Sequence, residues 1–508
     1  MRSVLFIFFI ALLSSSVHAQ QSLGHAASSY SGLHGAAVNP SQLSFNQRSW
    51  GIHLPGVGAN LQNNSLVVDR INLLSTAFGR TYSFEVDNAR NRRANAQAEV
   101  FLRANFDNPL DLRLQTWVMG LGGFLQYGRH AFGLSVGGRA FLELSNMAPA
   151  MATQLYEGLR FDSLLDQQIS SPGLRFNLLG FTETNLTWSY RFLQRRTRGA
   201  SVGVTAKVMN VHQSAHLDFE QFDYTVGSAS DTFLISNLGG TYGRSVGANG
   251  ILSGGGLALD FGFTYVDVDE SPSNAQKTST SINCFNFLSP RNRKLTAPPA
   301  HFWKLGISLL DLGLMRVNAF DFLMVGQGIP IGLREQLFNF SEEPFDATFK
   351  NRVDSFGLLA PSNTYTVGAP TALSVQFDYQ VVPFFYVNAS LMQRVPLFGQ
   401  YKLGRINQLM VAPRLQTFWA EIGLPMSLLE YRYPQVGLSA RIGPVSFGTD
   451  RLGELFGLKR VRGLDAYVSV DLFRFGVKQA VYPNAYFIKL LLLRKVTVIE
   501  YVCICGLP

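Results

Sequence analysis

Apolar and polar residues alternate along much of this chain, most clearly between residues 371 and 475. Residues 373–380, 436–443 and 464–472 each place an apolar side chain at every second position. Successive side chains of a strand point to opposite faces, so each segment has one apolar face and one polar or tightly packed face. The pattern fits a soluble β-sandwich, in which the apolar faces of two sheets meet in a core. It fits equally a membrane barrel, in which the apolar face contacts lipid.

The polar faces of several predicted strands carry charged side chains. Residues 130–143 and 254–265 show the pattern, with large apolar residues on one face and charges on the other. Inward-facing charges are expensive in a dry core and ordinary in a water-filled lumen. The alternation therefore predicts a set of lumen-facing residues, which comprises Arg139, Glu143, Asp260 and Arg441.

The N-terminus predicts export from the cytoplasm. Arg2 precedes an apolar stretch over residues 4–13, and residues 17–19 form a small-x-small cleavage site before Gln20. We therefore predict a signal peptide over residues 1–19. No later segment reaches the roughly 18 uncharged apolar residues of a membrane-spanning helix. A closed barrel is the other structure that crosses a bilayer with every backbone group hydrogen-bonded.

Composition and loop lengths favour the barrel. Charged residues make up 15% of the chain, aromatic residues 12%, and glycine occurs 47 times. Long connections alternate with short ones, as at the two rims of an outer-membrane barrel. We predict an all-β fold, a transmembrane antiparallel barrel of about 14 strands over residues 47–475. The expected location is the cell outer membrane, in contact with its lipid and lipopolysaccharide. An aromatic girdle would account for Trp50, Trp117, Trp188, Trp303 and Trp419.

Two segments lie outside the strand pattern. Residues 20–46 are rich in Gly, Ala and Ser, and Asn39-Pro40 is a turn signal. This N-terminal segment is predicted either to enter the lumen or to remain a disordered leader outside the barrel. Residues 151–159 predict a short amphipathic helix. That helix would either cap or enter the barrel mouth, or lie on an outside loop.

The sequence predicts no catalytic, metal or cofactor site. Cys284, Cys503 and Cys505 form neither a disulfide framework nor a zinc motif. No nucleophile elbow accompanies the histidines, and no phosphate-binding Lys-Ser/Thr follows the glycine runs. The net charge of +9 is not accompanied by a stacking platform, so nucleic acid is not an expected partner.

Several blocks of the chain resemble a family of uncharacterised outer-membrane proteins from Bacteroidota. The blocks are residues 30–41, 154–159, 304–313, 423–434 and 448–457. Asn39-Pro40 is also similar to the Asn-Pro-Ala motif of the fatty-acid-transporter superfamily, which includes the barrel partners of the type IX secretion system. Ser41 stands here where Ala is usual.

The superfamily resemblance implies a barrel of about 14 strands with a plug in its lumen. The plug-like motif would comprise Tyr30, Gly32, Gly35, Asn39 and Pro40. The implied function is passage of small hydrophobic or amphipathic compounds, with such a molecule as ligand. The alternative is a non-conducting barrel that binds an envelope protein or a secretion complex. Residues 476–508 depart from the family pattern and are either a frameshifted reading or an added element.

Overall fold

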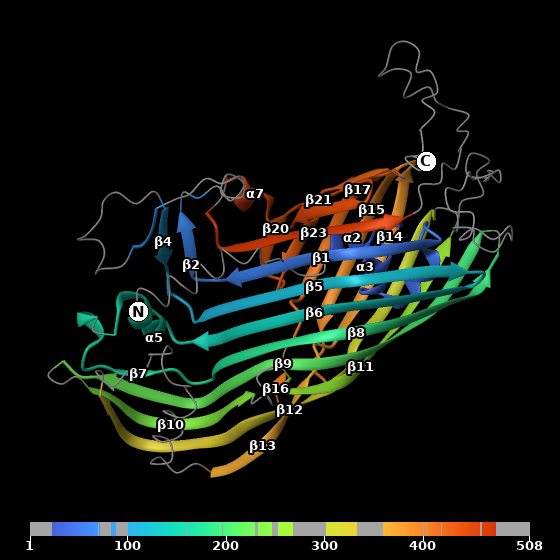
Figure 1. Cartoon of the computed structure of the whole chain (residues 1–508). Coiled ribbons are helices and arrows are strands. Elements are labelled where there is room, and N and C mark those ends of the chain that lie inside the picture. The colour runs from blue at the N-terminus through green and yellow to red at the C-terminus, as the bar shows by residue number, and fades with distance from the viewer. Residues whose placement is uncertain are drawn as a thin grey trace, which may run out of the picture.

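The computed structural model describes residues 23–69, 71, 83–87, 100–159, 161–195, 197–228, 232–245, 252–267, 301–332, 359–399, 401–402, 404–417, 419–457 and 460–473 (Figure 1). The predicted signal peptide, the predicted C-terminal tail and all three cysteines lie outside these residues. Within the described part of the chain, no helix has the length and apolarity to cross a membrane.

Antiparallel strands form a closed barrel with fourteen positions around its wall. The wall closes where the first strand pairs with the last, with Gly51 opposite Phe473. The strands, in order around the wall, are β1 (Trp50–Asn63), β5 (Leu110–Tyr127), β6 (His130–Met147), β8 (Leu174–Gln194), β9 (Arg198–Val226), β10 (Thr232–Ser245) with β11 (Gly254–Asp267), β12 (Trp303–Gly332), β13 (Leu359–Gly368) with β14 (Ala372–Val382), β15 (Phe385–Arg394), β17 (Gln408–Gln416), β18 (Ala420–Gly423) with β19 (Met426–Leu429), β20 (Tyr433–Val436) with β21 (Leu438–Ile442), β22 (Val445–Thr449) and β23 (Gly463–Phe473). The predicted all-β barrel of about 14 strands is confirmed.

The two rims of the barrel differ in their connections. Two-residue turns follow β5, β14 and β21, and β1 begins and β23 ends at the same rim. The opposite rim carries a small sheet and two helices (Figure 1). These elements are β2 (Leu66–Asp69), β3 (Phe84–Val86), β4 (Val100–Ala104), α5 (Pro149–Glu157) and α7 (Leu452–Leu455). Such a contrast is typical of outer-membrane barrels, in which the short turns face the periplasm.

The outer face of the wall is apolar and the inner face is polar. Large apolar side chains stand exposed at alternate positions, as for Leu134 (54%) and Leu257 (68%), whereas Ser135 and Asp260 are buried. A soluble protein shows the reverse arrangement, so the exposed band is a lipid-facing surface. Aromatic residues gather near the rim with the short turns, where Trp188 stacks with Tyr190.

Trp117 corrects one expectation about this aromatic girdle. Its side chain is only 8% exposed and lies in edge contact with His34, inside the barrel. The residue sits on the inward face of β5, so it contributes to the lumen and not to the membrane interface.

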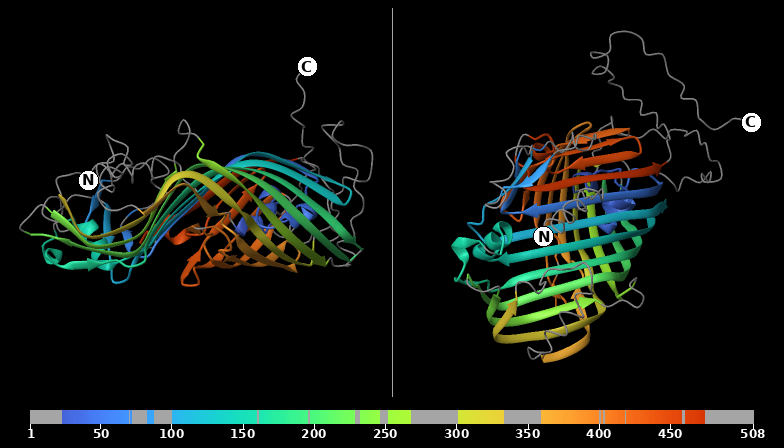
Figure 2. Two further views of the ribbon diagram at one scale, coloured as in Figure 1. Left: turned by 90° about the horizontal axis from the view of Figure 1, so that it is seen from below. Right: turned by 60° about the vertical axis from the view of Figure 1, so that its left-hand side comes forward.

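Several strands run well past the length that a bilayer needs. β9 has 29 residues and β12 has 30, whereas about 9–11 residues of a tilted strand cross the hydrocarbon core. Their far ends continue into an open, curved sheet beyond the barrel (Figure 2).

Helix α5 rests on this extended sheet. The predicted helix over residues 151–159 is thus confirmed with slightly different bounds, and it lies outside the lumen. Ala152 belongs to an apolar cluster with Tyr224 and Ile235, and the Tyr224 hydroxyl donates to Gln154 Oε1 at 2.8 Å. β7 (Gln168–Ser170) extends the same sheet by pairing with β9.

A charge on the lipid-facing surface should destabilise the barrel according to its depth. We expect Leu259→Arg, in the middle of β11, to lower the free energy of unfolding by about 2–4 kcal/mol. Tyr127→Arg, at the rim, should cost about 0–1 kcal/mol. Unfolding by urea in lipid vesicles is monitored by the difference in gel mobility between boiled and unboiled protein. Equal losses of unfolding free energy in the two variants would contradict the placement of β11. A wild-type chain without any difference in gel mobility would contradict the barrel.

Candidate functional site

The N-terminal segment lies inside the barrel. α2 (Leu23–Ala26), α3 (Leu33–Ala36) and the 3-10 helix η1 (Pro40–Phe45) are buried almost throughout. Figures 1 and 2 show these elements enclosed between the early and the late strands of the wall. We call residues 23–46 the lumenal segment.

The Asn39-Pro40-Ser41 turn is the most densely bonded part of the lumenal segment. Asn39 Nδ2 donates to the Phe263 carbonyl oxygen and to Gln376 Oε1, both at 3.1 Å. Asn39 Oδ1 accepts from the Ser41 backbone N–H at 3.1 Å and so begins η1. The Asn-Pro pair therefore shapes the turn and ties it to strands β11 and β14.

Two wall strands approach this turn so closely that the residue at the point of contact must be glycine. A Cβ atom at Gly203 would lie 2.4 Å from the Ser41 nitrogen, and one at Gly262 would lie 2.2 Å from Asn39 Oδ1. The hydroxyls of Ser189 and Ser201 flank the glycines and both donate to the Ser41 carbonyl oxygen at 3.0 Å. The wall thus presents a glycine and serine surface that matches the turn.

The other residues of the predicted plug-like motif occupy separate places. The Tyr30 ring lies under the guanidinium group of Arg441 at 4.8 Å, which links the lumenal segment to β21. Gly32 has a φ of +56° and sits against the Phe124 ring, where a Cβ atom would clash. Gly35 packs against Ser31 within the segment.

A network of charges centred on Asp311 crosses the middle of the lumen. Arg139 donates to both oxygens of the fully buried Asp311, at 2.7 and 2.8 Å, and also pairs with Glu183. Lys207 Nζ lies 2.6 Å from Asp311 and 2.7 Å from Asp260. In this way β6, β8, β9, β11 and β12 are joined through side chains across the interior.

A β-bulge creates the centre of this network. The register between β11 and β12 shifts next to Asp260, so both Leu310 and Asp311 point inward. Asp311 adopts a φ of +54°, and its backbone N–H donates to Asp260 Oδ1 at 2.7 Å. Asp260 therefore holds the bulge that presents Asp311.

The connection between β15 and β17 folds inward and completes the network. It contains β16 (Tyr401–Lys402), which pairs with β13, and Arg405, whose Nη2 donates to Asp311 at 2.5 Å. Gln115 of β5 donates to the Gly404 carbonyl oxygen at 3.0 Å from the opposite wall. Three cations thus share the single carboxylate of Asp311.

The four predicted lumen-facing residues belong to three separate groups. Arg139 and Asp260 meet in the Asp311 network, and Glu143 pairs with Arg113 at 3.0 Å. Arg441 faces Glu421 at 3.8 Å, near a further network in which Asp378 binds Arg414 and His301. Sequence reasoning missed Asp311, because two consecutive inward residues, Leu310 and Asp311, interrupt the alternation there.

An apolar layer lines the inner wall beside the Asp311 network. Phe141, Phe181, Met209, Met315 and Tyr365 belong to one buried cluster, and Tyr401 packs against it. The guanidinium group of Arg139 lies 5.1 Å from the centre of the Phe181 ring, so the charged and apolar layers touch.

Two small cavities lie between these layers in the described part of the lumen. One of about 40 Å³ lies between α3 and the Arg139 network, and one of about 30 Å³ lies between Leu23 and Phe141. Ligand pockets usually measure about 300–1,000 Å³. At these two places the lumenal segment therefore leaves too little space for a ligand.

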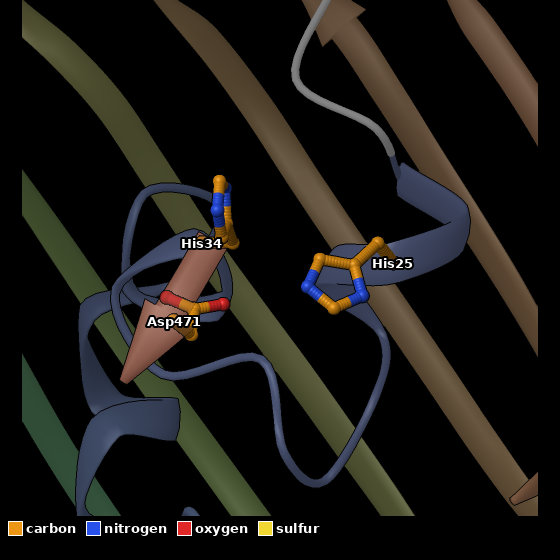
Figure 3. Close-up of side chains that lie close together, drawn as sticks. All are labelled: His25, His34 and Asp471. Atoms are coloured by element: carbon orange, nitrogen blue, oxygen red, sulfur yellow. The ribbon is translucent and has the colours of Figure 1, made fainter. Parts of the chain in front are cut away.

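Histidines gather where the lumenal segment meets the seam of the barrel (Figure 3). His25 and His34 come from α2 and α3, and Asp471 comes from β23. His53 of β1 shares a hydrogen bond of 2.8 Å with Asp471. Burial lowers the pKa of His34 to about 4, helped by the neighbouring His53, and burial also holds the pKa of His25 well below its usual value. Both imidazoles are therefore neutral at pH 7.

Comparison with known proteins assigns the chain to a family. Residues 43–450 match a family of unknown function, DUF5723. The chain belongs to this family. No curated protein matches the sequence. The resemblance to a barrel family of unknown function is thereby confirmed, whereas a Bacteroidota source and a link to type IX secretion stay predictions.

Solved barrels of similar topology share little sequence with this DUF5723 chain. The Pseudomonas putida toluene transporter TodX is 9% identical with a TM-score of 0.38, covering 89% of this chain and 95% of its own. The Ralstonia pickettii toluene transporter TbuX is 10% identical with a TM-score of 0.37, covering 87% and 94%. A Pseudomonas aeruginosa FadL homologue is 8% identical with a TM-score of 0.23, covering 88% and 95%. Scores at this level carry no argument about function.

Removal of the central carboxylate should destabilise the DUF5723 barrel strongly. Asp311→Asn leaves Arg139, Lys207 and Arg405 without their shared anion, and breaking a buried ion pair costs about 3–5 kcal/mol. Asp218→Asn is the matched control, because Asp218 pairs with Arg175 at 3.1 Å on the exposed sheet, where a pair contributes about 0–1 kcal/mol. Urea unfolding in vesicles gives the free energy of unfolding of both variants. Similar losses of unfolding free energy in the two variants would show that the Asp311 network does not stabilise the barrel interior.

Proposed function

We propose that this protein is an outer-membrane barrel that passes small hydrophobic or amphipathic compounds, with the lumenal segment as its plug. The observation that carries the proposal is the close fit of the Asn39-Pro40-Ser41 turn into a glycine and serine surface of the wall. The polar bonds of this turn are individually weak and can be exchanged for others when the segment moves.

The class of compound follows from the lining beside the plug. The buried layer around Phe141, Phe181 and Met315 is apolar, whereas the adjoining Arg139 network is polar. A molecule that crosses both layers needs an apolar body and tolerates a polar end, which describes an amphipathic compound. TodX and TbuX are named as toluene transporters, which is consistent with this class but adds no weight at their TM-scores.

Orientation in the membrane follows from the rims. The rim with the two-residue turns would face the periplasm, and the extended sheet with α5 would face lipopolysaccharide outside the cell. In this orientation the lumenal segment enters the barrel from the periplasmic side, where a signal peptide over residues 1–19 would have been removed.

A second function is favoured by the extended sheet. The far ends of β9, β10 and β12 form a broad surface beyond the lipid band, supported by α5. A barrel that served only as a pore would not need this surface. The alternative proposal is therefore a non-conducting barrel that binds an envelope protein through the sheet.

Loosening the plug should open the pore. We expect deletion of residues 20–46 to raise single-channel conductance in planar bilayers and antibiotic entry in cells. Gly203→Val should do the same without shortening the chain, because its side chain collides with Ser41. Gly239→Val is the matched control, since the nearest atom to a Cβ there lies 3.9 Å away. Unchanged conductance in both plug variants would contradict the plug.

Purification of the native protein distinguishes transport from scaffolding. We expect native mass spectrometry of the protein in mild detergent to detect a bound lipid or another apolar molecule, displaced in a variant with Phe181→Arg. Phe233→Arg, on the extended sheet, is the control and should leave the ligand bound. A stoichiometric protein partner that is lost only in Phe233→Arg would instead favour the scaffold.

A further inference from the structure

The histidine cluster at the barrel seam has the composition of a metal site. One ring nitrogen each of His25 and His34 and one carboxylate oxygen of Asp471 lie within 4.8 Å of one another. The three residues come from α2, α3 and β23, so the site forms only when the lumenal segment is in place (Figure 3).

Buried polar atoms of the cluster have no hydrogen-bond partner among the described residues. These atoms are Nε2 of His25, Nε2 of His34 and Oδ2 of Asp471. The residues are 3%, 6% and 6% exposed. A buried polar atom without a partner costs about 1–3 kcal/mol, and such atoms usually have an explanation. Three such atoms in residues whose ligand atoms lie within 4.8 Å of one another point to a shared ligand.

The donor set selects the kind of ligand. Imidazole nitrogen with one carboxylate suits Zn²⁺ and the neighbouring first-row divalent metals. Ca²⁺ and Mg²⁺ prefer sites made of oxygen atoms alone. Two ligand atoms on one tetrahedral Zn²⁺ lie about 3.3 Å apart, given bond lengths of about 2.0–2.1 Å. The ligand atoms of this cluster, which lie up to 4.8 Å apart, would have to move closer to one another on binding such an ion.

His53 orients the carboxylate. Its Nδ1 lies 2.8 Å from Asp471 Oδ1, which leaves Oδ2 without a hydrogen-bond partner among the described residues. A histidine or carboxylate behind a metal ligand commonly fixes the ligand in this way. His53 and Asp471 are also direct neighbours across the β1 and β23 pairing that closes the barrel.

Charges near the cluster limit its affinity. The positive charges of Arg48 and Arg441 lower the pKa of His25, and they would also repel a cation bound there. Arg441 is partly balanced by Glu421 at 3.8 Å, and Asp471 supplies the negative charge within the site. We therefore expect weaker binding than in a site with several thiolates.

We propose that His25, His34 and Asp471 bind Zn²⁺ and thereby fasten the lumenal segment to the closing seam of the barrel. The ion would join two helices of the lumenal segment to the last strand. Without the ion, the first half of the segment would keep its hydrogen bonds to Glu421 and Lys304 and the packing of Leu23 against the wall.

Metal binding is tested on the full-length protein, purified without a polyhistidine tag and treated with a chelator. We expect one equivalent of Zn²⁺ after dialysis, measured by mass spectrometry of the metal. Co²⁺ in place of Zn²⁺ should give the visible absorption of a tetrahedral nitrogen and oxygen site. Wild-type protein that retains no Zn²⁺ and shows no Co²⁺ absorption would overturn the proposal without reference to any variant.

Variants locate the site. His25→Ala and His34→Ala should each weaken Zn²⁺ binding about 100-fold or more, and His53→Ala about 10–100-fold. His130→Ala, which removes a histidine from the rim with the short turns, is the control and should bind like the wild type. Binding that is unchanged in both His25→Ala and His34→Ala would place the metal elsewhere and overturn the proposal.

A structural readout tests the fastening itself. Zn²⁺ should raise the temperature at which the folded gel band of the wild type is lost, and should not do so for His25→Ala. No Zn²⁺ effect on the wild-type band would overturn the fastening role. These measurements do not depend on conductance, so failure of the transport proposal would be seen separately.

Discussion

The buried carboxylate of Asp311 is the constraint on which the interior depends. Arg139 and Lys207 reach it from the wall, and Arg405 reaches it from the connection that folds inward. Such charges are tolerated inside a barrel only if each finds a partner, because desolvation of an unpaired ion is far more expensive than the pairing gains. The positions of β6, β9, β12 and the inward connection are therefore mutually dependent.

The lumenal segment uses a different principle. It contributes few charges and is held by amides, hydroxyls, close backbone contacts and small apolar clusters, with Asn39 at the centre of the polar contacts. Two cavities between the segment and the Asp311 network are small. One part of the interior is therefore fixed by strong ion pairs, and the other is held by bonds that are individually weak.

The alternating pattern was sufficient to predict the wall, and it failed where the period of two is interrupted. Arg139 and Asp260 were assigned to the polar face because their strands alternate regularly. The bulge at Leu310 and Asp311 reverses the inward positions of β12, so the pattern of residues 303–311 stops there although the strand continues. A register shift at His212 likewise interrupts the alternation along β9, although that strand continues to Val226. His25 and Asp471 lie far apart in sequence, and no local spacing reveals that they meet.

The position of the lumenal segment also has a consequence for assembly. Asn39 bonds to a residue 337 positions later, and Ser28 bonds to one 393 positions later. The segment comes first in the sequence, yet its binding surface exists only after β14 and β18 have joined the wall. Contacts between such distant residues form late in folding. The segment that is synthesised before the wall is thus among the last parts to reach its final place.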